Sequence, residues 1–400
     1  MTIAWVSTYQ PAWEAKSRRI MGPDEDLLTM AVAAAAAGLQ SLEADPVGRI
    51  ILVTDQPDVI NTAAYGVIRR SLGLPDPIPV EFRVGGAPAA LDALVSSPTG
   101  TLVIGVEDRS RGAAAGAALV TDRGMTVEHA GRVDGSLPMR VRALGAPHAR
   151  LYDDARLERE RGWRPAIQEL VDGQDPVFIA GITAKEAPKL FRQAVGTDEA
   201  VGASAPFFAL AGMASESQRG VLVAVDEASG QAARVEGGTP AMVRDSRRSA
   251  VPAELAPRFV DDGTEIPVAL PAYERAFDAK VGFVAARCEC GELSYPPRSL
   301  CLSCGTSGAS TPVALPREGT VYTVVTVHIK VPAMATPYAR AVVDVDGTPL
   351  RVLAAVTDVP PLTCGIGDHG SFVLRRVATR EGVPDYGYSF QPTEREAVTG

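Results

Sequence analysis

Four of the five cysteines in this 400-residue chain fall within one short stretch. They are Cys288, Cys290, Cys301 and Cys304. Two close pairs of cysteines, each followed by a glycine, are typical of a zinc ribbon, in which four thiolates hold one tetrahedral ion while the glycines let the chain turn tightly. Because all four ligands would be thiolates, no coordination position remains for water. The sequence therefore predicts a zinc ion with a structural role.

The first pair departs from the usual spacing, because only Glu289 separates its two cysteines. Two other interpretations stay open: a ribbon that kept its shape but lost its affinity for metal, and a disulfide pair. The fifth cysteine, Cys364, lies far from the ribbon in sequence, and we expect it to be a buried thiol rather than a nucleophile.

Composition and charge exclude several classes of protein. Hydrophobic residues make up 46% of the chain and charged residues 22%, as in ordinary globular proteins, and the mass of 41.9 kDa predicts two or three domains. The net charge of −9 argues against a nucleic-acid-binding protein, which would carry a basic surface. We find no signal peptide and no apolar run long enough to cross a bilayer, so we expect a cytoplasmic protein with reduced thiols and no membrane partner.

Residues 1–240 alternate between strand-like and helix-like segments, which is the pattern of an α/β fold. Helices are expected where alanine and leucine dominate, and the first of them opens with an acidic turn at Asp24. The expected strands cover residues 3–7, 49–54, 101–106 and 177–181, and the expected helices cover residues 24–39, 63–72, 87–95 and 205–214.

The chain also repeats itself. Residues 102–120 and 221–235 share one pattern: an apolar strand, an acidic turn, a bend rich in glycine and alanine, and a second apolar strand. Duplication of such a unit predicts two similar halves within this part of the chain.

One stretch of this region resembles a known family. Residues 22–31 are similar to the Gly-x-Asp-x-Asp-x-x-Thr-Met stretch of the HMG-CoA synthase family, and residues 101–120, 202–211 and 220–235 resemble later stretches of that family in the same order. The family belongs to the thiolase superfamily, whose fold consists of two duplicated α/β halves. The resemblance therefore implies an α/β thiolase-like duplicated domain over residues 1–240.

The resemblance fails at the residues that would carry the chemistry. The family's nucleophile is a cysteine in a Cys-x-Gly-Gly-type turn, and the matching residues 83–91 contain no cysteine. The histidine expected in the second half is also missing, since His129 and His148 lie between the halves, and Ala203 or Ser204 replaces an expected asparagine. Thioester exchange needs a thiolate and a base. We therefore expect a degenerate domain with no catalytic residue, and we expect His148 to lie in a surface loop.

A degenerate domain of this kind can still hold coenzyme A. Gly85 and Gly86 precede a predicted helix, where backbone N–H groups can bind an anion. The alternative is that these two glycines only form a tight turn between a strand and a helix.

The rest of the chain is expected to form a linker over residues 241–267, a short helix with the ribbon over residues 268–310, and a barrel over residues 311–400. The barrel is predicted from short strands near residues 319–329, 339–345, 349–355 and 370–375, with a hairpin signal at Asp346-Gly347.

Residues 268–395 resemble the zinc-ribbon and OB-fold family that accompanies acyl-CoA enzymes. The motifs that carry the resemblance are the ribbon itself and residues 295–298, 319–322, 337–338 and 390–392. The resemblance implies an all-β OB-fold barrel that forms part of a coenzyme A channel. It places Arg298 near a coenzyme A phosphate, or as a rigid surface arginine, and it places Tyr338 against adenine, or as a packing residue of the barrel.

Three functional hypotheses follow. The leading one is an accessory, non-nucleophilic subunit of an acyl-CoA carbon–carbon bond forming or cleaving complex, of the thiolase, HMG-CoA synthase or aldolase type. Its expected partner is a catalytically complete thiolase-superfamily protein, with a homodimer as the alternative, and its ligand is a coenzyme A thioester. The second hypothesis is a self-sufficient acyltransferase with an unusual nucleophile, and the third is an OB-fold nucleic-acid-binding protein.

Overall fold

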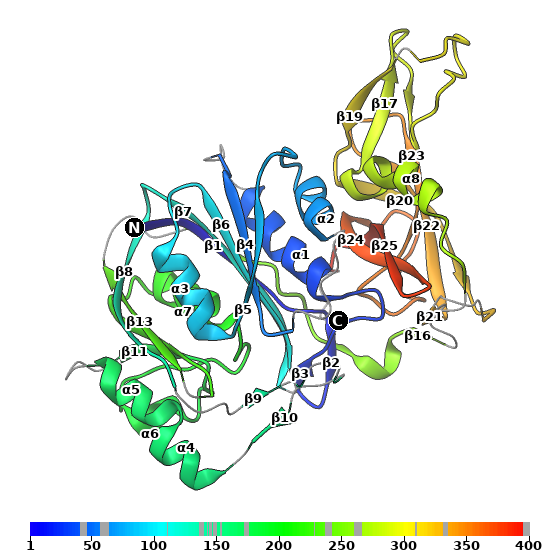
Figure 1. The fold of residues 1–400 in the computed structure, drawn as a ribbon. Coiled ribbons are helices and arrows are strands. Elements are labelled where there is room, and N and C mark those ends of the chain that lie inside the picture. Colours follow the sequence, from blue (N-terminus) through cyan, green and yellow to red (C-terminus); the bar gives the residue numbers. More distant parts are fainter. Residues whose placement is uncertain are drawn as a thin grey trace. The chain divides into compact units, whose positions relative to one another are not determined.

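We describe the protein from a computed structural model (Figure 1). It describes residues 1–40, 46–56, 64–109, 111–135, 140–141, 143, 146, 150–152, 154–171, 176–227, 229–236, 242–259, 266–308, 310–330 and 335–394. The chain forms two compact units. Unit 1 consists of Met1–Gln10, Ala34–Asn61 and Pro77–Arg247, and unit 2 consists of Pro11–Ala33, Thr62–Asp76 and Arg248–Gly400. Each unit therefore contains stretches that are far apart in the sequence. The predicted domain limits stay a prediction.

Unit 1 is built on one large mixed sheet. Its strands run in the order β11-β12-β13-β8-β1-β7-β6-β4-β5, and β14 pairs with β1 in parallel. The strands are β1 (Thr2–Tyr9), β4 (Arg49–Thr54), β5 (Val80–Val84), β6 (Thr101–Arg109), β7 (Gly112–Thr121), β8 (Met125–Val133), β11 (Pro176–Ala180), β12 (Gly220–Val225), β13 (Gly230–Glu236) and β14 (Met242–Asp245), with a separate pair of β9 (Arg140–Val141) and β10 (Arg150–Leu151). Residues 242–245 were predicted as linker, and they instead extend this sheet.

The order of the strands confirms the predicted duplication. In the first half β4 is parallel to β6, β6 forms an antiparallel hairpin with β7, and β7 pairs with β1. In the second half β11 is parallel to β12, β12 forms an antiparallel hairpin with β13, and β13 pairs with β8. The two repeated stretches of sequence form the two hairpins. Among the described residues the second half has no counterpart of β5.

Two helices are buried against this sheet. Helices α3 (Ala87–Ser96) and α7 (Ala205–Ser215) are apolar around most of their circumference and belong to one core cluster with the sheet. Helix α7 approaches closely because β6 and β7 carry glycines beneath it: a Cβ at Gly105 would lie 2.0 Å from the carbonyl oxygen of Ala203, and one at Gly116 would lie 2.4 Å from Cβ of Phe207. Helices α4 (Ala155–Arg161), α5 (Trp163–Val171) and α6 (Ala187–Leu190) complete the unit, and α5 packs on the second half.

Unit 2 contains two sheets that carry its candidate sites. A three-stranded sheet, in the order β18-β17-β19, forms the ribbon, and a five-stranded sheet, in the order β23-β22-β20-β24-β25, forms the barrel. The strands are β17 (Val284–Cys288), β18 (Leu293–Ser294), β19 (Ser310–Ala314), β20 (Glu318–Val327), β22 (Tyr338–Val345), β23 (Arg351–Ala355), β24 (His369–Arg380) and β25 (Val383–Pro392). Helix α8 (Leu270–Gly282) precedes the ribbon, as expected, and an aromatic cluster around Phe283, Phe372 and Phe390 fills the space beside it.

The remaining elements of unit 2 come from the N-terminal region and from residues 251–336. Helix α2 (Ala64–Ser71) packs against α8. The short elements are β2 (Trp13–Ala15), β3 (Arg18–Arg19), β15 (Val251–Pro252), the 3-10 helix η2 (Ala253–Leu255), β16 (Arg258–Phe259) and β21 (Ala335–Thr336). Helix α1 (Leu27–Leu39) has residues in both units. No helix among the described residues is long and apolar enough to cross a membrane.

Candidate metal centre and degenerate active site

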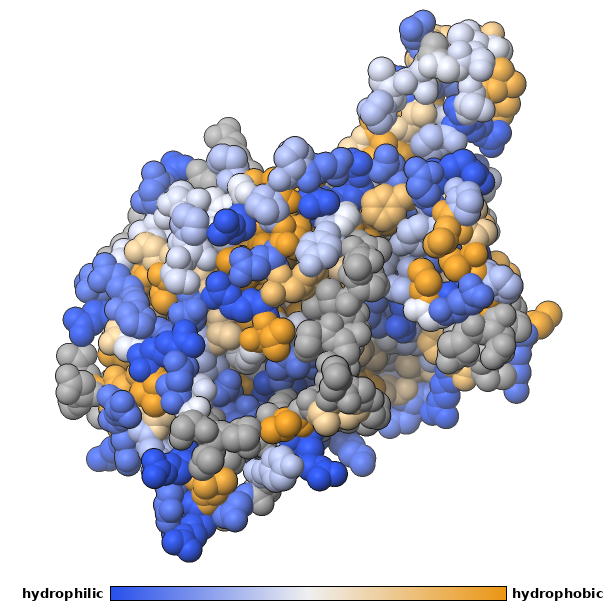
Figure 2. All heavy atoms as spheres, in the orientation of Figure 1, coloured by the Kyte–Doolittle hydropathy of each residue, from blue (hydrophilic) through white to orange (hydrophobic). Residues whose placement is uncertain are grey.

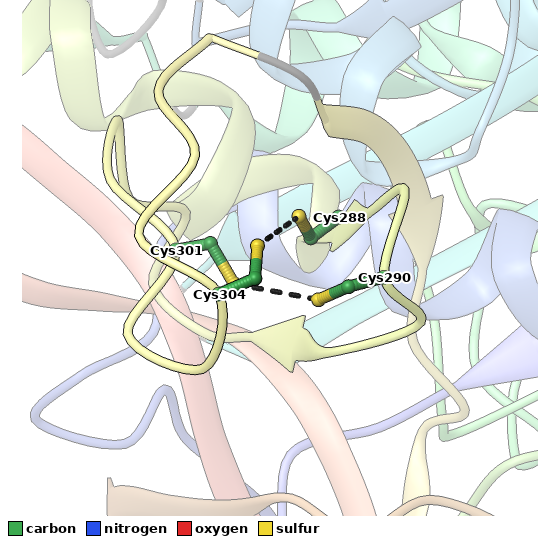
Figure 3. A group of neighbouring side chains, drawn as sticks. All are labelled: Cys288, Cys290, Cys301 and Cys304. Carbon is green, nitrogen blue, oxygen red and sulfur yellow. Dashed lines mark hydrogen bonds between the residues drawn. The ribbon is translucent and has the colours of Figure 1, made fainter.

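The four predicted ligands of the ribbon converge (Figure 3). Their sulfur atoms all lie within 4.8 Å of one another, with 3.7 Å between Cys288 and Cys304 and 3.7 Å between Cys290 and Cys301. A tetrahedral zinc ion with Zn–S bonds of about 2.3 Å separates its sulfur ligands by about 3.8 Å. The four thiols therefore fit a zinc ion, and the short spacing around Glu289 does not prevent it.

Two tight turns hold the cysteines in this arrangement. After the first pair, the N–H of Gly291 donates to the carbonyl of Cys288, and Gly291 adopts a φ of 95°. After the second pair, the N–H of Gly305 donates to the carbonyl of Cys301, with a φ of 72°. Both φ values lie in the left-handed region that favours glycine. The glycines noted in the sequence thus have the predicted role.

The chemistry of the donor set also suits a divalent ion. All four cysteines are free thiols, so the disulfide interpretation does not describe this structure. Hydrogen bonding with Thr306, whose Oγ1 lies 3.3 Å from Sγ of Cys304, lowers the pKa of Cys304 to about 6. In Cys288 a backbone hydrogen bond with Cys290 opposes the shift, but burial and the neighbouring thiols raise the pKa to about 12. A bound zinc ion would supply the positive charge that lets all four thiols ionise together. The buried thiol expected at Cys364 is confirmed.

The elbow before α3 contains no nucleophile. Gly85 has a φ of 155°, and a Cβ there would lie 2.4 Å from Cβ of Ala89, so no residue with a side chain fits without a shift. Gly86 is the N-cap of α3, and a Cβ on it would lie 3.1 Å from Nη2 of Arg109 and 3.5 Å from Oδ2 of Asp226. A guanidinium group therefore lies next to the elbow at which the family carries its cysteine.

Buried charges surround this guanidinium. Nη2 of Arg109 lies 2.6 Å from Oδ2 of Asp55, and both side chains are at most 14% exposed. Glu107 is 1% exposed and accepts the backbone N–H groups of Val201 at 2.8 Å and Ser204 at 3.3 Å. Burial raises the pKa of Glu107, although the charge of Arg109 and the two N–H groups oppose the shift.

Our reading of the sequence missed this cluster of charges. Its only signal was the run Glu107-Asp108-Arg109 at the end of a buried strand, which we interpreted as an acidic turn. In the structure β6 continues through Arg109, so these side chains stay within the fold. His129 is exposed on β8 with its Nδ1 2.7 Å from Nε2 of Gln231, and His148 lies outside the described residues.

Two of the predicted coenzyme A residues line different pockets of unit 2, and the other two belong to unit 1. Arg298 is exposed and lines a pocket of the ribbon with Cys288 and Tyr295. Tyr338 is half-buried at the start of β22, with the Arg340 guanidinium 5.7 Å from its ring centre, and it lines a different pocket of unit 2. Gly85 and Gly86 belong to unit 1. The role of all four residues in binding coenzyme A stays a prediction.

The structure holds one other group of potential metal ligands among the described residues. Glu318, Asp346 and His369 lie at one end of β20, β22 and β24, and all three are exposed. Nε2 of His369 lies 3.0 Å from Oδ2 of Asp346. His369 and Asp346 therefore form a pair at the surface, and we assign no metal to the three residues.

The geometry thus defines a protein that joins a duplicated, thiolase-like α/β fold to a cysteine ribbon and an OB-fold barrel. Comparison with known proteins agrees with this description. Residues 312–369 match the family model described as "ChsH2, C-terminal OB-fold domain". A DUF35 domain-containing scaffold protein from Methanocaldococcus jannaschii is 30% identical over 116 residues, which are 28% of this chain and 82% of that protein. A protein of the same description from Pyrococcus furiosus is 30% identical over 130 residues, or 32% of this chain and 94% of the relative.

The chain therefore belongs to the family of DUF35 domain-containing proteins. Its matches to these relatives cover about a third of its length or less. Among solved structures, 3-oxoacyl-[acyl-carrier-protein] synthase III from Aquifex aeolicus VF5 is similar at 17% identity with a TM-score of 0.48, over 59% of this chain and 99% of that one. That likeness concerns the fold alone.

Proposed function

We propose that the protein is an accessory, non-nucleophilic subunit of a complex that forms or cleaves carbon–carbon bonds in acyl-CoA compounds. The observation that carries the proposal is the elbow before α3, where residues 83–86 offer no nucleophile and the guanidinium of Arg109 lies beside Gly86. The two relatives described as scaffold proteins support a role in assembly rather than in turnover.

The ribbon has a structural role in this proposal. A zinc ion held by the four cysteines would fix the positions of β17, β18 and the loop that carries Arg298. Because all four ligands are sulfur, the ion would offer no open position to a substrate. The coenzyme A thioester would bind along unit 2, and Arg298 and Tyr338 remain the residues that we propose for it.

The edge of the unit 1 sheet offers a surface for a partner. Among the described residues β5 pairs with β4 alone, so it lies at an edge of the sheet. Val84 at its end is 66% exposed. Helix α3 offers no such surface, because its Leu91 and Leu94 are fully buried in the core of unit 1. The strand, rather than the helix, is therefore the contact that we propose.

The surface of the barrel adds apolar area. Tyr322, Val325, Leu353, Leu362 and Ile366 are each at least half exposed, and Figure 2 shows hydrophobic side chains gathered over the strands of the barrel. Apolar clusters of this kind on a protein surface often mark an interaction site. A thiolase-superfamily protein with its cysteine and histidine intact is the partner that we propose.

The test uses the full chain alone and co-expressed with such a thiolase. Intact mass after incubation with acetyl-CoA and acetoacetyl-CoA should show no adduct on the chain alone, and the pair should co-elute in size exclusion with light scattering. Two variants compare the two proposed contacts with the partner: Val84→Lys changes the edge of β5, and Val325→Lys changes the surface of the barrel. An acyl adduct on residues 80–95 would instead support the self-sufficient enzyme, and a chain that stays monomeric with the thiolase would contradict the subunit proposal.

A further inference from the structure

Two of the four ribbon cysteines are exposed to solvent. They are Cys290 and Cys304, whereas Cys301 is half-buried and Cys288 is buried. With zinc bound, all four would be thiolates, which are the nucleophilic form of cysteine. Oxidation of a cysteine follows its thiolate character and its exposure. The ribbon therefore presents two thiolates to a dissolved oxidant.

The closest sulfur contacts join the two turns of the ribbon to each other (Figure 3). Sγ of Cys288 lies 3.7 Å from Sγ of Cys304, and Sγ of Cys290 lies 3.7 Å from Sγ of Cys301. A disulfide needs about 2.05 Å between its two sulfur atoms, so each pair has to approach by roughly 2 Å or less. Each exposed thiol thus has one partner thiol on the opposite turn.

The segment that carries three of these cysteines has almost no hydrophobic core. Among residues 289–308, Leu293 alone is buried, and Leu300 and Leu302 are 48% and 72% exposed. The order of this segment therefore depends on its backbone hydrogen bonds and on cross-links between its turns, rather than on packed side chains. The same segment supplies Arg298 and most of the lining of the pocket beside it. A change in the cross-links should also change that pocket.

We propose that the ribbon is a site of reversible oxidation, at which a hydroperoxide converts the four thiolates into the disulfides Cys288–Cys304 and Cys290–Cys301 and zinc is released. Both disulfides would still join the two turns, so a reductant and zinc together should restore the ribbon. The proposal rests on the zinc site and goes beyond the proposed acyl-CoA role, because it involves no coenzyme A.

The oxidation balances with two molecules of hydrogen peroxide. In each pair, the exposed thiolate of Cys304 or Cys290 attacks one peroxide oxygen, the O–O bond breaks, and one proton is taken up to give a sulfenic acid and water. The second thiolate attacks the sulfenic sulfur, the S–S bond forms, and the departing hydroxide takes up a proton to become a second water. Each pair thus gives two electrons to one peroxide. Because thiolates are the form of cysteine that binds metal, their loss removes the zinc ligands.

The experiment uses the full chain loaded with one equivalent of zinc and freed of excess metal and reductant. Hydrogen peroxide is added in about tenfold molar excess, and a colorimetric indicator follows the free zinc. We expect release of about one equivalent of zinc per chain, and an intact mass about 4 Da below that of the reduced chain. A phosphine reductant and zinc should then restore both the mass and the metal content.

Peptide mapping without reduction identifies the pairs. Cleavage after Glu289 and after Leu302 separates the two members of each turn, so each disulfide links two different peptides. We expect Cys288 to be recovered with Cys304, and Cys290 with Cys301. This map needs neither a variant nor bound zinc, so it decides the pairing in the wild-type chain.

Two variants provide the comparison. Cys364→Ala removes the buried thiol outside the ribbon and should change neither the zinc release nor the map. Cys290→His keeps four potential zinc ligands, because zinc sites with three cysteines and one histidine are common, and it should form the Cys288–Cys304 disulfide alone.

Three results would overturn the proposal: free thiols that persist after the peroxide treatment, disulfides within one turn or between chains, and oxidation that the phosphine does not reverse. Because the test contains neither coenzyme A nor a thiolase, its failure leaves the proposed subunit role untouched.

Discussion

Replacement of Arg109 by methionine tests whether the degenerate elbow is held by buried charge. The side chains of Arg109 and Asp55 are 14% and 10% exposed, and their charged atoms lie 2.6 Å apart. Burial alone would lower the pKa of Arg109, but the charges of Asp55 and Glu107 outweigh it and raise that pKa. Without the guanidinium, the buried carboxyl groups of Asp55 and Glu107 would lose the cation that both of them face.

The expected loss follows from this arrangement. Removal of one partner of a buried ion pair costs about 3–5 kcal/mol, because the other charge stays buried without compensation. We therefore expect Arg109→Met to lower the free energy of unfolding by about 3 kcal/mol or more. The double variant Arg109→Met with Asp55→Asn removes both charges of the pair and should lose less than the sum of the two single variants.

The assay is urea denaturation followed by circular dichroism and by tryptophan fluorescence, with both single variants and the double variant forming a cycle. Arg123→Met is the matched control. Arg123 forms an exposed pair with Asp122 at 3.7 Å, and its replacement should change stability by about 0.5 kcal/mol or less. If the free energy of unfolding of Arg109→Met lies within 1 kcal/mol of the wild-type value, or if the effects in the cycle are additive, the charges do not hold the elbow together.

Two other predictions concern the metal and the pH. Protein purified without added zinc should contain about one equivalent of zinc by atomic absorption. The variant Cys304→Ser should lower this zinc content at least fivefold, and Cys364→Ser should leave it unchanged. A folded wild-type protein with less than a tenth of an equivalent would exclude the zinc site. The folded-state pKa of Glu107 is raised above its ordinary 4.5, so its contribution to stability is present below that value and is lost as the pH rises through the folded pKa. Urea midpoints measured from pH 4.5 upward should therefore fall less steeply for Glu107→Gln than for the wild type, and parallel curves would contradict this.

Local patterns in the sequence were enough to predict the strands and helices with long apolar runs, whereas β5, β8, α4, α5 and β25 were not predicted. The strand at residues 49–54 and the helix at residues 205–214 were predicted within one residue, because long apolar runs leave few alternatives. The ribbon was predictable for a similar reason: the metal site is local, and its four ligands and two glycines lie within one short stretch.

Features that depend on distant parts of the chain were not predictable in this way. Nothing in the spacing of Asp55 and Arg109 shows that the two would meet beside Gly86. The acidic run at Asp24 was interpreted as the start of a helix that favours negative charge. In the structure α1 begins at Leu27, and the carboxyl groups before it join a buried network with β24. A single sequence records the charges, whereas only tertiary packing brings them together.

The interleaving of the two units constrains how this chain can be made and divided. Unit 2 takes two of its three segments from the first 76 residues and the third from residues after Arg247. During synthesis the early segments of unit 2 cannot complete their packing until the ribbon and the barrel have left the ribosome. Until then, side chains that are buried in the folded chain, such as Trp13, lack their contacts. A gene cut near residue 248 would separate these segments, and each fragment would expose apolar surface that the other normally covers. Fission of the gene at this point would therefore destabilise both products. The relatives nevertheless show that a protein of about the size of the C-terminal region exists by itself.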